Sequence, residues 1–185
     1  MKIMPKEELD DAGIKSLKRE VFIYPTDTIY GIGCDARDEK LVSFVRSIKR
    51  RPETPFSVIA PSKKWIFDNC EIDEKAKKWI EKLPGAYTLI LNLKNHNAVA
   101  KNVSFGRTLG VRIPAHWFSG IVEKLGFPIV TTSVNLHGEK NMASIEDLNE
   151  EIKKEVSLCV YEGEKKGSAS TIADLSGESE RIIAR

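Results

Sequence analysis

The chain has 185 residues, and at about 100–200 residues per domain this length predicts one domain, spanning residues 1–185. Hydrophobic residues make up 41% of the chain and charged residues 30%, which excludes global disorder and a fibrous repeat. The 29 Lys and Arg residues exceed the 27 Asp and Glu residues by only two, so a general affinity for nucleic acid is not indicated and any basic site has to be local.

The cysteines and the apolar runs indicate the cellular environment. Cys34, Cys70 and Cys159 are widely spaced and form no Cys-x-x-Cys pair, which favours buried reduced thiols over a zinc ribbon or a disulfide framework. The first six residues lack the apolar segment of a signal peptide, and the run near residues 88–93 is too short to cross a bilayer. We therefore expect a soluble cytoplasmic protein with no membrane partner.

Strand-like and helix-like segments alternate from residue 21 to residue 184. Apolar residues at i, i+3, i+4 and i+7 predict helices, and β-branched or aromatic runs that stop at Pro or Gly predict strands. In chain order we expect a strand at 21–24, a helix at 41–48, a strand at 56–60, a short helix capped by Ser62, a helix at 76–83, strands at 87–93 and 109–113, a helix at 118–125, a strand at 128–134, a capping box of Ser144 and Asp147 before a helical segment that includes residues 148–152, and strands at 158–161, 170–175 and 181–184. The polar segment 96–106 is expected to be a mobile loop. The alternation is typical of an α/β or α+β domain with one large sheet.

The segment Gly31-Ile-Gly33-Cys-Asp-Ala36 has the spacing of a dinucleotide-binding turn. That turn needs a strand directly before it and a second strand about 20 residues later. Pro25 and the polar residues 26–28 interrupt the first strand, and the basic residues 49–51 lie where the second should run. We therefore reject dinucleotide binding, and the chain also lacks the P-loop pattern G-x-x-x-x-G-K-[ST].

Polar side chains gather at the ends of several predicted strands and helices. The Thr-Asp-Thr segment 26–28 suits a small polar ligand, or an ordinary turn that begins at Pro. The basic residues 49–51 suit phosphate groups, or the C-terminus of a helix. Arg112 lies between apolar neighbours and needs an anion, from the protein or from a ligand. Ser133 and Asn135 are two residues apart in an extended segment, so their side chains share one face.

The sequence contains no evident Ser-His-Asp or Cys-His set and no suggestive pair of carboxylates. His96, His116 and His137 lack metal-ligand spacing and are read as surface or loop residues. Hydroxyls at strand ends with scattered Arg and Lys suit chemistry done by positioning and charge neutralisation, such as phosphoryl or nucleotidyl transfer.

Taken in order, these segments resemble the Sua5/YciO/YrdC family of L-threonylcarbamoyladenylate synthases. The matching motifs are Pro25-Thr-Asp-Thr28-x-Tyr30-Gly31-x-Gly33, Lys49-x-Arg51-Pro52, Pro84-Gly85, Val111-Arg-Ile-Pro114, Ser133-x-Asn135, Ser170-Thr171 and the closing Ile-Ile-x-Arg185. The resemblance implies the short, single-domain form of the family. It also implies a YrdC-like twisted, largely mixed sheet that is flanked by helices and has a concave basic face.

The resemblance further implies a reaction in which L-threonine, bicarbonate and ATP, with Mg2+, give threonylcarbamoyl-AMP and pyrophosphate. The product would supply a downstream tRNA threonylcarbamoyl-transferase complex that forms N6-threonylcarbamoyladenosine at position 37 of tRNA. Weak binding of tRNA by this chain is a further expectation.

The family motifs carry residue roles onto this chain. Contacts to threonine are implied for Thr28, Arg112, Ser133 and Ser170. Contacts to ATP are implied for Lys49, Arg51, Thr54, Thr108, Asn135 and Arg185. Of these, Lys49 and Arg51 are the expected catalytic residues, because they would neutralise the phosphates. No side chain is assigned as general base or as metal ligand.

The chain departs from the family pattern at three places. A histidine common near the threonine site corresponds to Ile59, and a Ser-Pro-Thr segment corresponds to Asn141-Met142-Ala143. The segment from Pro52 to Phe56 is one residue shorter than in many members, so the alignment of Thr54 depends on where that gap falls. Two alternatives therefore stay open: a non-catalytic RNA-binding module, and a paralogue that forms another carbamoyl-adenylate, as in hydrogenase maturation proteins.

Overall fold

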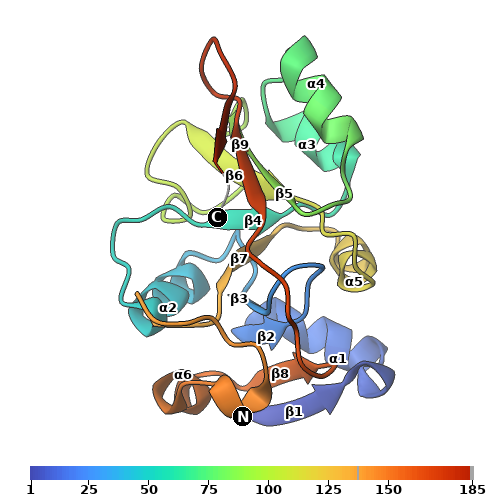
Figure 1. Ribbon diagram of the computed structural model, residues 1–185, viewed down its shortest axis with the longest axis vertical. Helices are drawn as coiled ribbons and strands as arrows, with labels where there is room; N and C mark the ends of the chain where they lie inside the picture. The colour runs from blue at the N-terminus through green and yellow to red at the C-terminus, as the bar shows by residue number, and fades with distance from the viewer. Residues whose placement is uncertain (137, 184–185) are drawn as a thin grey trace.

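The computed structural model describes residues 1–136 and 138–183, and in them ten strands form one mixed sheet (Figure 1). The strands are β1 (Lys2–Pro5), β2 (Phe22–Tyr24), β3 (Gly31–Gly33), β4 (Ser57–Ile59), β5 (Tyr87–Asn92), β6 (Thr108–Arg112), β7 (Ile129–Ser133), β8 (Leu158–Tyr161), β9 (Thr171–Asp174) and β10 (Arg181–Ile183). The helices are α1 (Asp11–Ser16), α2 (Glu39–Lys49), α3 (Lys63–Asn69), α4 (Glu74–Glu81), α5 (Phe118–Leu125) and α6 (Glu150–Glu155), with 3-10 turns η1 (Lys6–Glu8), η2 (Leu17–Arg19) and η3 (Ile145–Asp147).

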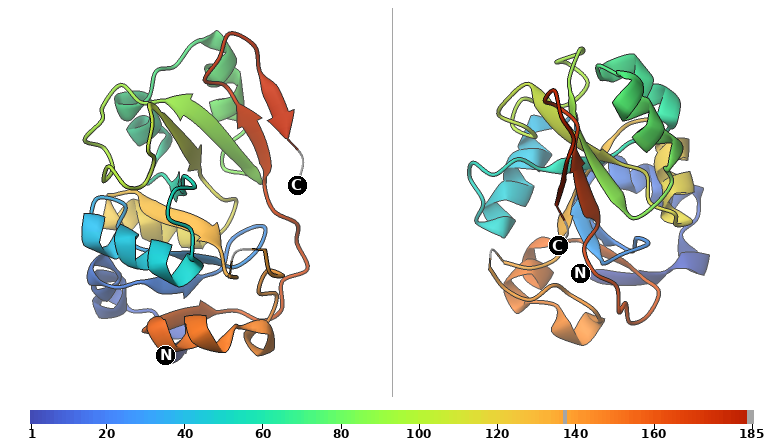
Figure 2. Two further views of the ribbon diagram at one scale, coloured as in Figure 1. Left: turned by 90° about the vertical axis from the view of Figure 1, so that its left-hand side faces the viewer. Right: turned by 45° about the horizontal axis from the view of Figure 1, so that its top comes forward.

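The strand order is β1-β8-β2-β3-β7-β4-β6-β5-β9-β10. Four neighbouring pairs are parallel, namely β1–β8, β8–β2, β4–β6 and β5–β9, and the other five are antiparallel. Figure 2 shows the sheet twisting between the end that carries β1 and the end that carries β10. The expectation of a largely mixed sheet flanked by helices is confirmed.

Alternate residues of the strands feed two separate hydrophobic cores, as the two-residue period of a strand requires. In β4, Val58 packs into the larger core, to which α2, α3, α4 and α6 contribute, while Ile59 packs into the smaller core with α1 and α5. In β7, Val130 and Ile129 divide in the same way. The helices therefore cover both faces of the sheet.

Most predicted elements are confirmed to within about two residues, and their ends have local causes. Asp38 begins α2 by accepting from the backbone N–H groups of Lys40 and Leu41. Ser62 begins α3 through the N–H of Trp65, as predicted. The capping box of Ser144 and Asp147 is also present. It closes only the turn η3, however, and Asn149 caps α6 separately, so the segment is two short elements.

Two regions differ from the sequence-based expectation. The sequence analysis did not predict strands β1 and β3 or helix α1. These elements are too short and too poor in apolar residues to give a periodic signal. The loop 96–106 is not simply polar, because Ala98, Val99 and Val103 are buried in it. Its backbone also bonds to Arg46 and Phe56, so the loop is anchored to its surroundings.

The three cysteines are free and buried, as predicted. Within residues 1–136 and 138–183, none of the helices has the length and apolar character needed to cross a membrane.

Candidate active site

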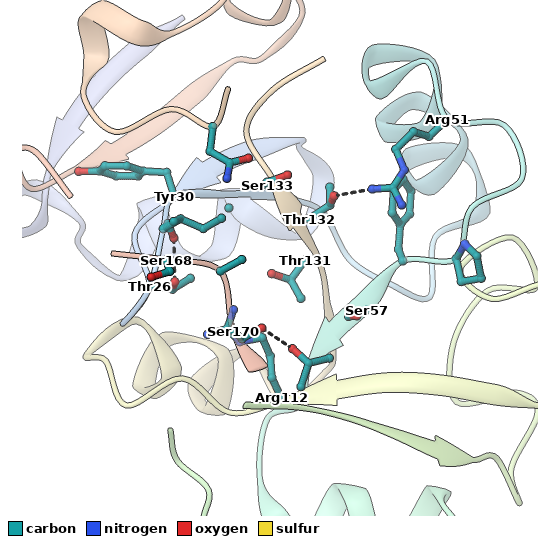
Figure 3. Close-up of a pocket in the computed structure, with 17 residues that line it drawn as sticks. Thr26, Tyr30, Arg51, Ser57, Arg112, Thr131, Thr132, Ser133, Ser168 and Ser170 are labelled. Carbon is teal, nitrogen blue, oxygen red and sulfur yellow. Dashed lines mark hydrogen bonds between the residues drawn. The ribbon is translucent and has the colours of Figure 1, made fainter. Parts of the chain in front are cut away.

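A cavity of about 510 Å³ opens between the β2–β3 turn, β4, β7 and the segment that leads into β9. This volume is in the range of small-molecule sites. Figure 3 shows its polar wall, which includes Thr26, Tyr30, Arg51, Ser57, Arg112, Thr131, Thr132, Ser133, Ser168 and Ser170. Hydroxyl groups predominate among these side chains, so the cavity can offer many hydrogen bonds but few charges.

The hydroxyl-rich wall continues the sheet face of the smaller core. Along β7 one face presents first Ile129, which is fully buried, and then Thr131 and Ser133, which line the cavity. Along β4 the same face presents Ile59 in the core and Ser57 in the cavity. Every second residue of a strand lies on the same face, so replacing apolar residues by hydroxyl residues along that face extends the core into a polar cavity wall. Ile59, the residue at the family histidine position, is 0% exposed and does not line the cavity.

Arg112 forms one end of the cavity and is 6% exposed. Its Nη2 donates to Asp27 Oδ1 at 2.6 Å, and Asp27 also accepts from the backbone N–H of Ala115. Both terminal nitrogens of Arg112 lie 3.3–3.4 Å from Thr28 Oγ1. Its Nε is buried without a partner among the described residues. The sequence left open whether a protein carboxylate or a ligand provides the anion for this arginine. In the structure Asp27 provides a carboxylate, and Arg112 still lines the cavity.

The turn before β3 is fixed by its own hydroxyls and by a close backbone approach. Thr26 Oγ1 donates to Ile29 O at 2.7 Å and lies 3.0 Å from Thr28 Oγ1. Gly167 lies so close to this turn that a Cβ there would be 2.1 Å from Thr28 O. Glycine at this position therefore lets the segment 168–170 reach the cavity. Thr28 itself stands behind Arg112 and is not part of the cavity wall.

Ser133 and Ser170, two predicted threonine contacts, both line the cavity. Ser170 Oγ lies 2.7 Å from Thr88 Oγ1 on β5. Ser133 Oγ donates to Asn135 Oδ1 at 2.7 Å, which confirms that these two side chains share a face. Asn135, however, lies behind the wall and not on it.

Lys49 is buried, with 1% of its surface exposed, and does not line the cavity. Its Nζ donates to Ser133 O at 2.5 Å, Asn135 O at 2.5 Å and Asn135 Oδ1 at 2.6 Å. Burial and the charge of Arg51 lower the pKa of Lys49 to about 7. The expected direct contact of Lys49 with phosphate is therefore not preformed, because three protein oxygens already occupy the three hydrogens of its ammonium group.

The three consecutive cations of residues 49–51 separate in space. Arg50 ends α2 in the left-handed conformation, with φ of 50°, and pairs with Glu151 on the surface. Arg51 lines the cavity, where its Nη1 donates to Thr132 Oγ1 at 3.4 Å (Figure 3). Of the two readings of this basic run, the helix C-terminus applies to Arg50, and the phosphate reading fits the position of Arg51.

Two other predicted ATP contacts are not brought to the cavity, and a third lies outside the described residues. Thr54 is exposed, and its carbonyl accepts from Arg46. Thr108 lies on β6, where its carbonyl accepts from Ser104. Arg185 and His137 lie outside the described residues. Asn141, one of the departures from the family pattern, does line the cavity.

Sequence reasoning assigned no individual site role to Asp27, Tyr30, Thr88 or Ser168, although Asp27 and Ser168 belong to segments that it read as ligand-binding loops or turns. Asp27 is the carboxylate within the Pro25-Thr-Asp-Thr28 motif, and the need of Arg112 for an anion was a signal that could have found it. Thr88 meets Ser170 only because β5 and β9 pair in parallel, which no local pattern reports. Tyr30 holds the segment after β8, because its hydroxyl donates to Gly163 O at 2.6 Å.

The oxygen-bearing side chains of the cavity wall decide whether the protein itself could hold Mg2+. No carboxylate is among the residues that form the described cavity wall, and the part of the chain that the structure covers contains no cluster of three metal-ligating residues. Protein-held Mg2+ takes oxygen ligands and usually includes one or two carboxylates. These residues do not fit a resident magnesium site.

Comparison with known proteins identifies relatives along nearly the whole chain. The family model Sua5_yciO_yrdC, described as "Telomere recombination", matches residues 16–185. A protein of Methanocaldococcus jannaschii named "Putative threonylcarbamoyl-AMP synthase" is 34% identical over 174 residues, which cover 91% of this chain and 79% of that protein.

Two solved structures are similar in fold. P. abyssi Sua5 complexed with L-threonine superposes with a TM-score of 0.87 at 26% identity, over 99% of this chain and 57% of that one. This chain therefore spans about half of that protein. E. coli YciO has a TM-score of 0.87 at 21% identity and covers 100% of this chain and 95% of its own.

Proposed function

This chain belongs to the Sua5/YciO/YrdC family, and we propose that it is a nucleotidyltransferase that makes threonylcarbamoyl-AMP from L-threonine, bicarbonate and ATP. One observation carries the proposal. A single cavity has a buried arginine with hydroxyl neighbours at one end and a second arginine, Arg51, at the other. The name of the M. jannaschii relative and the threonine bound by P. abyssi Sua5 support this choice of substrates.

The end of the cavity near Arg112 suits the amino acid. Arg112 can give the threonine carboxylate a charge-assisted hydrogen bond while Asp27 keeps its guanidinium oriented. Ser133 and Ser170 are placed to bind the ammonium or hydroxyl group, since hydroxyls both donate and accept. Thr28 would act through Arg112, whose nitrogens it contacts.

The end near Arg51 suits the phosphates of ATP. The amine of threonine first adds to CO2, derived from bicarbonate, and releases a proton to give a carbamate. A carbamate oxygen then attacks the α-phosphorus in line, the bond from that phosphorus to the bridging oxygen breaks, and pyrophosphate leaves with the electron pair. Arg51 would stabilise the charge that develops on the phosphates, and the ammonium of Lys49 would add to the local positive potential from behind the wall.

Mg2+ is best treated as part of the ATP substrate, because the cavity wall offers it hydroxyls and no carboxylate. It would supply charge neutralisation on the phosphates. We further propose that residues 1–185 act as one YrdC-like domain. A downstream tRNA threonylcarbamoyl-transferase complex would consume the product, and any binding of tRNA by this chain would be weak.

The test is pyrophosphate release by the purified chain with MgATP and bicarbonate, with L-threonine, with L-serine and with no amino acid. We expect release and an AMP adduct that depend on threonine and bicarbonate and that are lost in Arg112→Ala. Arg50→Ala is the matched control, because Arg50 is an arginine of the same motif that points to the surface. Threonine binding without turnover would contradict the synthase and favour a paralogue.

A paralogue with another acceptor is the second candidate, and a specific observation favours it. Asn141, which replaces a hydroxyl-bearing segment of the family, lines the cavity. Its amide would change which groups the wall can bind. Replacing L-threonine by a panel of amino acids and amines in the same assay distinguishes the two candidates, because the paralogue would release pyrophosphate with an acceptor other than threonine.

A further inference from the structure

Arg46 is a buried arginine on α2 that has no part in the motifs or in the cavity wall. It is 7% exposed, and no carboxylate within residues 1–136 and 138–183 forms an ion pair with it. Burial and the nearby charge of Arg51 both lower the pKa of Arg46. Burying an arginine without a counter-ion is costly, so the groups that surround it must compensate.

The first compensating group is the backbone that follows α2. Arg46 Nη1 donates to Arg51 O at 2.9 Å and to Thr54 O at 2.9 Å, with Pro52 O at 3.4 Å. One guanidinium nitrogen thus holds three carbonyls of a segment that has no regular secondary structure. Since Arg51 is in this segment, its backbone is fixed directly by Arg46.

The second compensating group is the loop that precedes β6. Arg46 Nε donates to Asn102 O at 2.8 Å and Nη2 to Val103 O at 3.2 Å. Val103 O also accepts from the backbone N–H of Phe56 at 2.9 Å, directly before β4. Arg46 therefore joins two segments about 50 residues apart in the sequence.

Two aromatic rings pack against the same guanidinium. Its central carbon lies 4.3 Å from the ring centre of Phe56 and 4.5 Å from that of Phe105. Phe56 lines the cavity, and the guanidinium of Arg51 lies 5.8 Å from its ring. Phe105 is 55% exposed and covers the group from the loop side. Cation–π contacts of this kind gain strength when the cation is desolvated.

We propose that Arg46 is a positioning residue: it fixes the backbone of residues 51–54 and the ring of Phe56, and thereby directs Arg51 into the cavity to bind the phosphate chain of the substrate. The planar fork of the guanidinium is what reaches two segments at once, so lysine would not replace it. The inference rests on the proposed function in that it takes ATP as the substrate with phosphates. The inference predicts an effect on phosphate binding and none on threonine binding. Arg112 bonds to Asp27 and Thr28 and not to Arg46.

The experiment measures the affinities of wild type, Arg46→Lys and Arg46→Met for inorganic tripolyphosphate, ATP and L-threonine by titration calorimetry. Both variants should weaken tripolyphosphate and ATP binding by about tenfold or more, and leave the threonine affinity within about twofold. Val122→Ala, which creates a cavity where α5 packs into the smaller core, is the control for general destabilisation and should alter neither the tripolyphosphate affinity nor the threonine affinity.

Equal weakening of tripolyphosphate and threonine would overturn the inference, because a purely structural staple would loosen both ends. So would an unchanged tripolyphosphate affinity, or a wild type that does not bind tripolyphosphate. If the Arg46 variants fail to fold, Phe105→Ala decides, since its exposed ring can be removed without a core cavity. It should weaken tripolyphosphate binding by about two- to fivefold, and an unchanged affinity would overturn the inference. A wild type that binds tripolyphosphate but makes no threonylcarbamoyl-AMP would contradict the proposed function and leave this result standing.

Discussion

At one end of the cavity Arg112 is paired with Asp27, whereas on the α2 side Arg46 and Lys49 are both buried against carbonyl and amide oxygens. A paired cation contributes little net charge, which suits a zwitterion such as an amino acid. The guanidinium of Arg46 adds a positive charge that its carbonyl partners do not offset, which suits a polyanion such as a chain of phosphates. The two subsites therefore differ in what holds their cations, a carboxylate at one and neutral oxygens at the other, and not in the number of cations.

The largest effect is expected from breaking the paired end. Arg112→Met leaves the largely buried carboxylate of Asp27, 10% exposed, without its counter-ion, so the free energy of unfolding should fall by about 3–5 kcal/mol, and threonine binding should be lost. Denaturant unfolding and calorimetry measure the two effects. In the double variant Arg112→Met/Asp27→Asn, stability should recover in part while threonine binding stays absent. Full loss of stability in the double variant would contradict the pairing.

The α2 side can be tested through pH, because Lys49 is buried there. The pKa of Lys49 lies at about 7, below its ordinary value of 10.5, so between these values the unfolded chain binds a proton that the folded chain releases. The unfolding free energy of the wild type should therefore rise from pH 7 to pH 10 relative to Lys49→Met, by about 2–4 kcal/mol. Below pH 7 the full penalty of burying the charge remains.

Chemical denaturation at several pH values measures this difference. Lys40→Met, at an exposed position of the same helix, is the matched control and should run parallel to the wild type. Parallel curves for Lys49→Met and the wild type would show that Lys49 keeps its ordinary pKa, and would contradict the lowering of that pKa by burial.

A smaller effect is expected from the hydroxyl pair of Thr88 and Ser170 near Arg112. Thr88→Val keeps the shape of the side chain but removes the hydroxyl that meets Ser170 at 2.7 Å. The unfolding free energy should fall by about 1–2 kcal/mol, and the affinity for threonine should fall while that for tripolyphosphate is retained. Thr171→Val, on the neighbouring strand β9, provides a control outside the cavity wall. A loss of tripolyphosphate affinity in Thr88→Val would contradict the division.

The smallest effect concerns ionic strength. Raising the salt concentration should weaken ATP binding by about several-fold, because the net charge of the α2 side acts at a distance. The same change should alter threonine binding by less than about twofold, since that end contains a local ion pair. Calorimetric titrations at low and high sodium chloride make the comparison, and equal salt dependence for both ligands would remove the electrostatic distinction.

Strongly periodic elements could be predicted from the sequence, and so could the strand-end motifs. Helix α2 was predicted by its apolar face, and Arg51, Arg112, Ser133 and Ser170 do line one cavity. The strand pairings could not be predicted, since residues such as Thr88 and Ser170 meet only through the parallel pairing of β5 with β9. The motif also predicted a direct contact of Lys49 with phosphate, which the structure does not preform. A sequence does not show how many acceptors surround a buried ammonium group.

The strand order has a consequence for how this chain reaches its fold. Among the described residues β1 pairs with β8, so Lys2 lies opposite Leu158. Strand β1 therefore has no pairing partner during synthesis until β8 has been made. Pairings so distant in sequence form slowly, and an unpaired strand edge is prone to aggregation meanwhile. Strand β2 has a near partner in β3, so that part of the sheet can form early, whereas the edge that carries β1 closes only after β8 has been made.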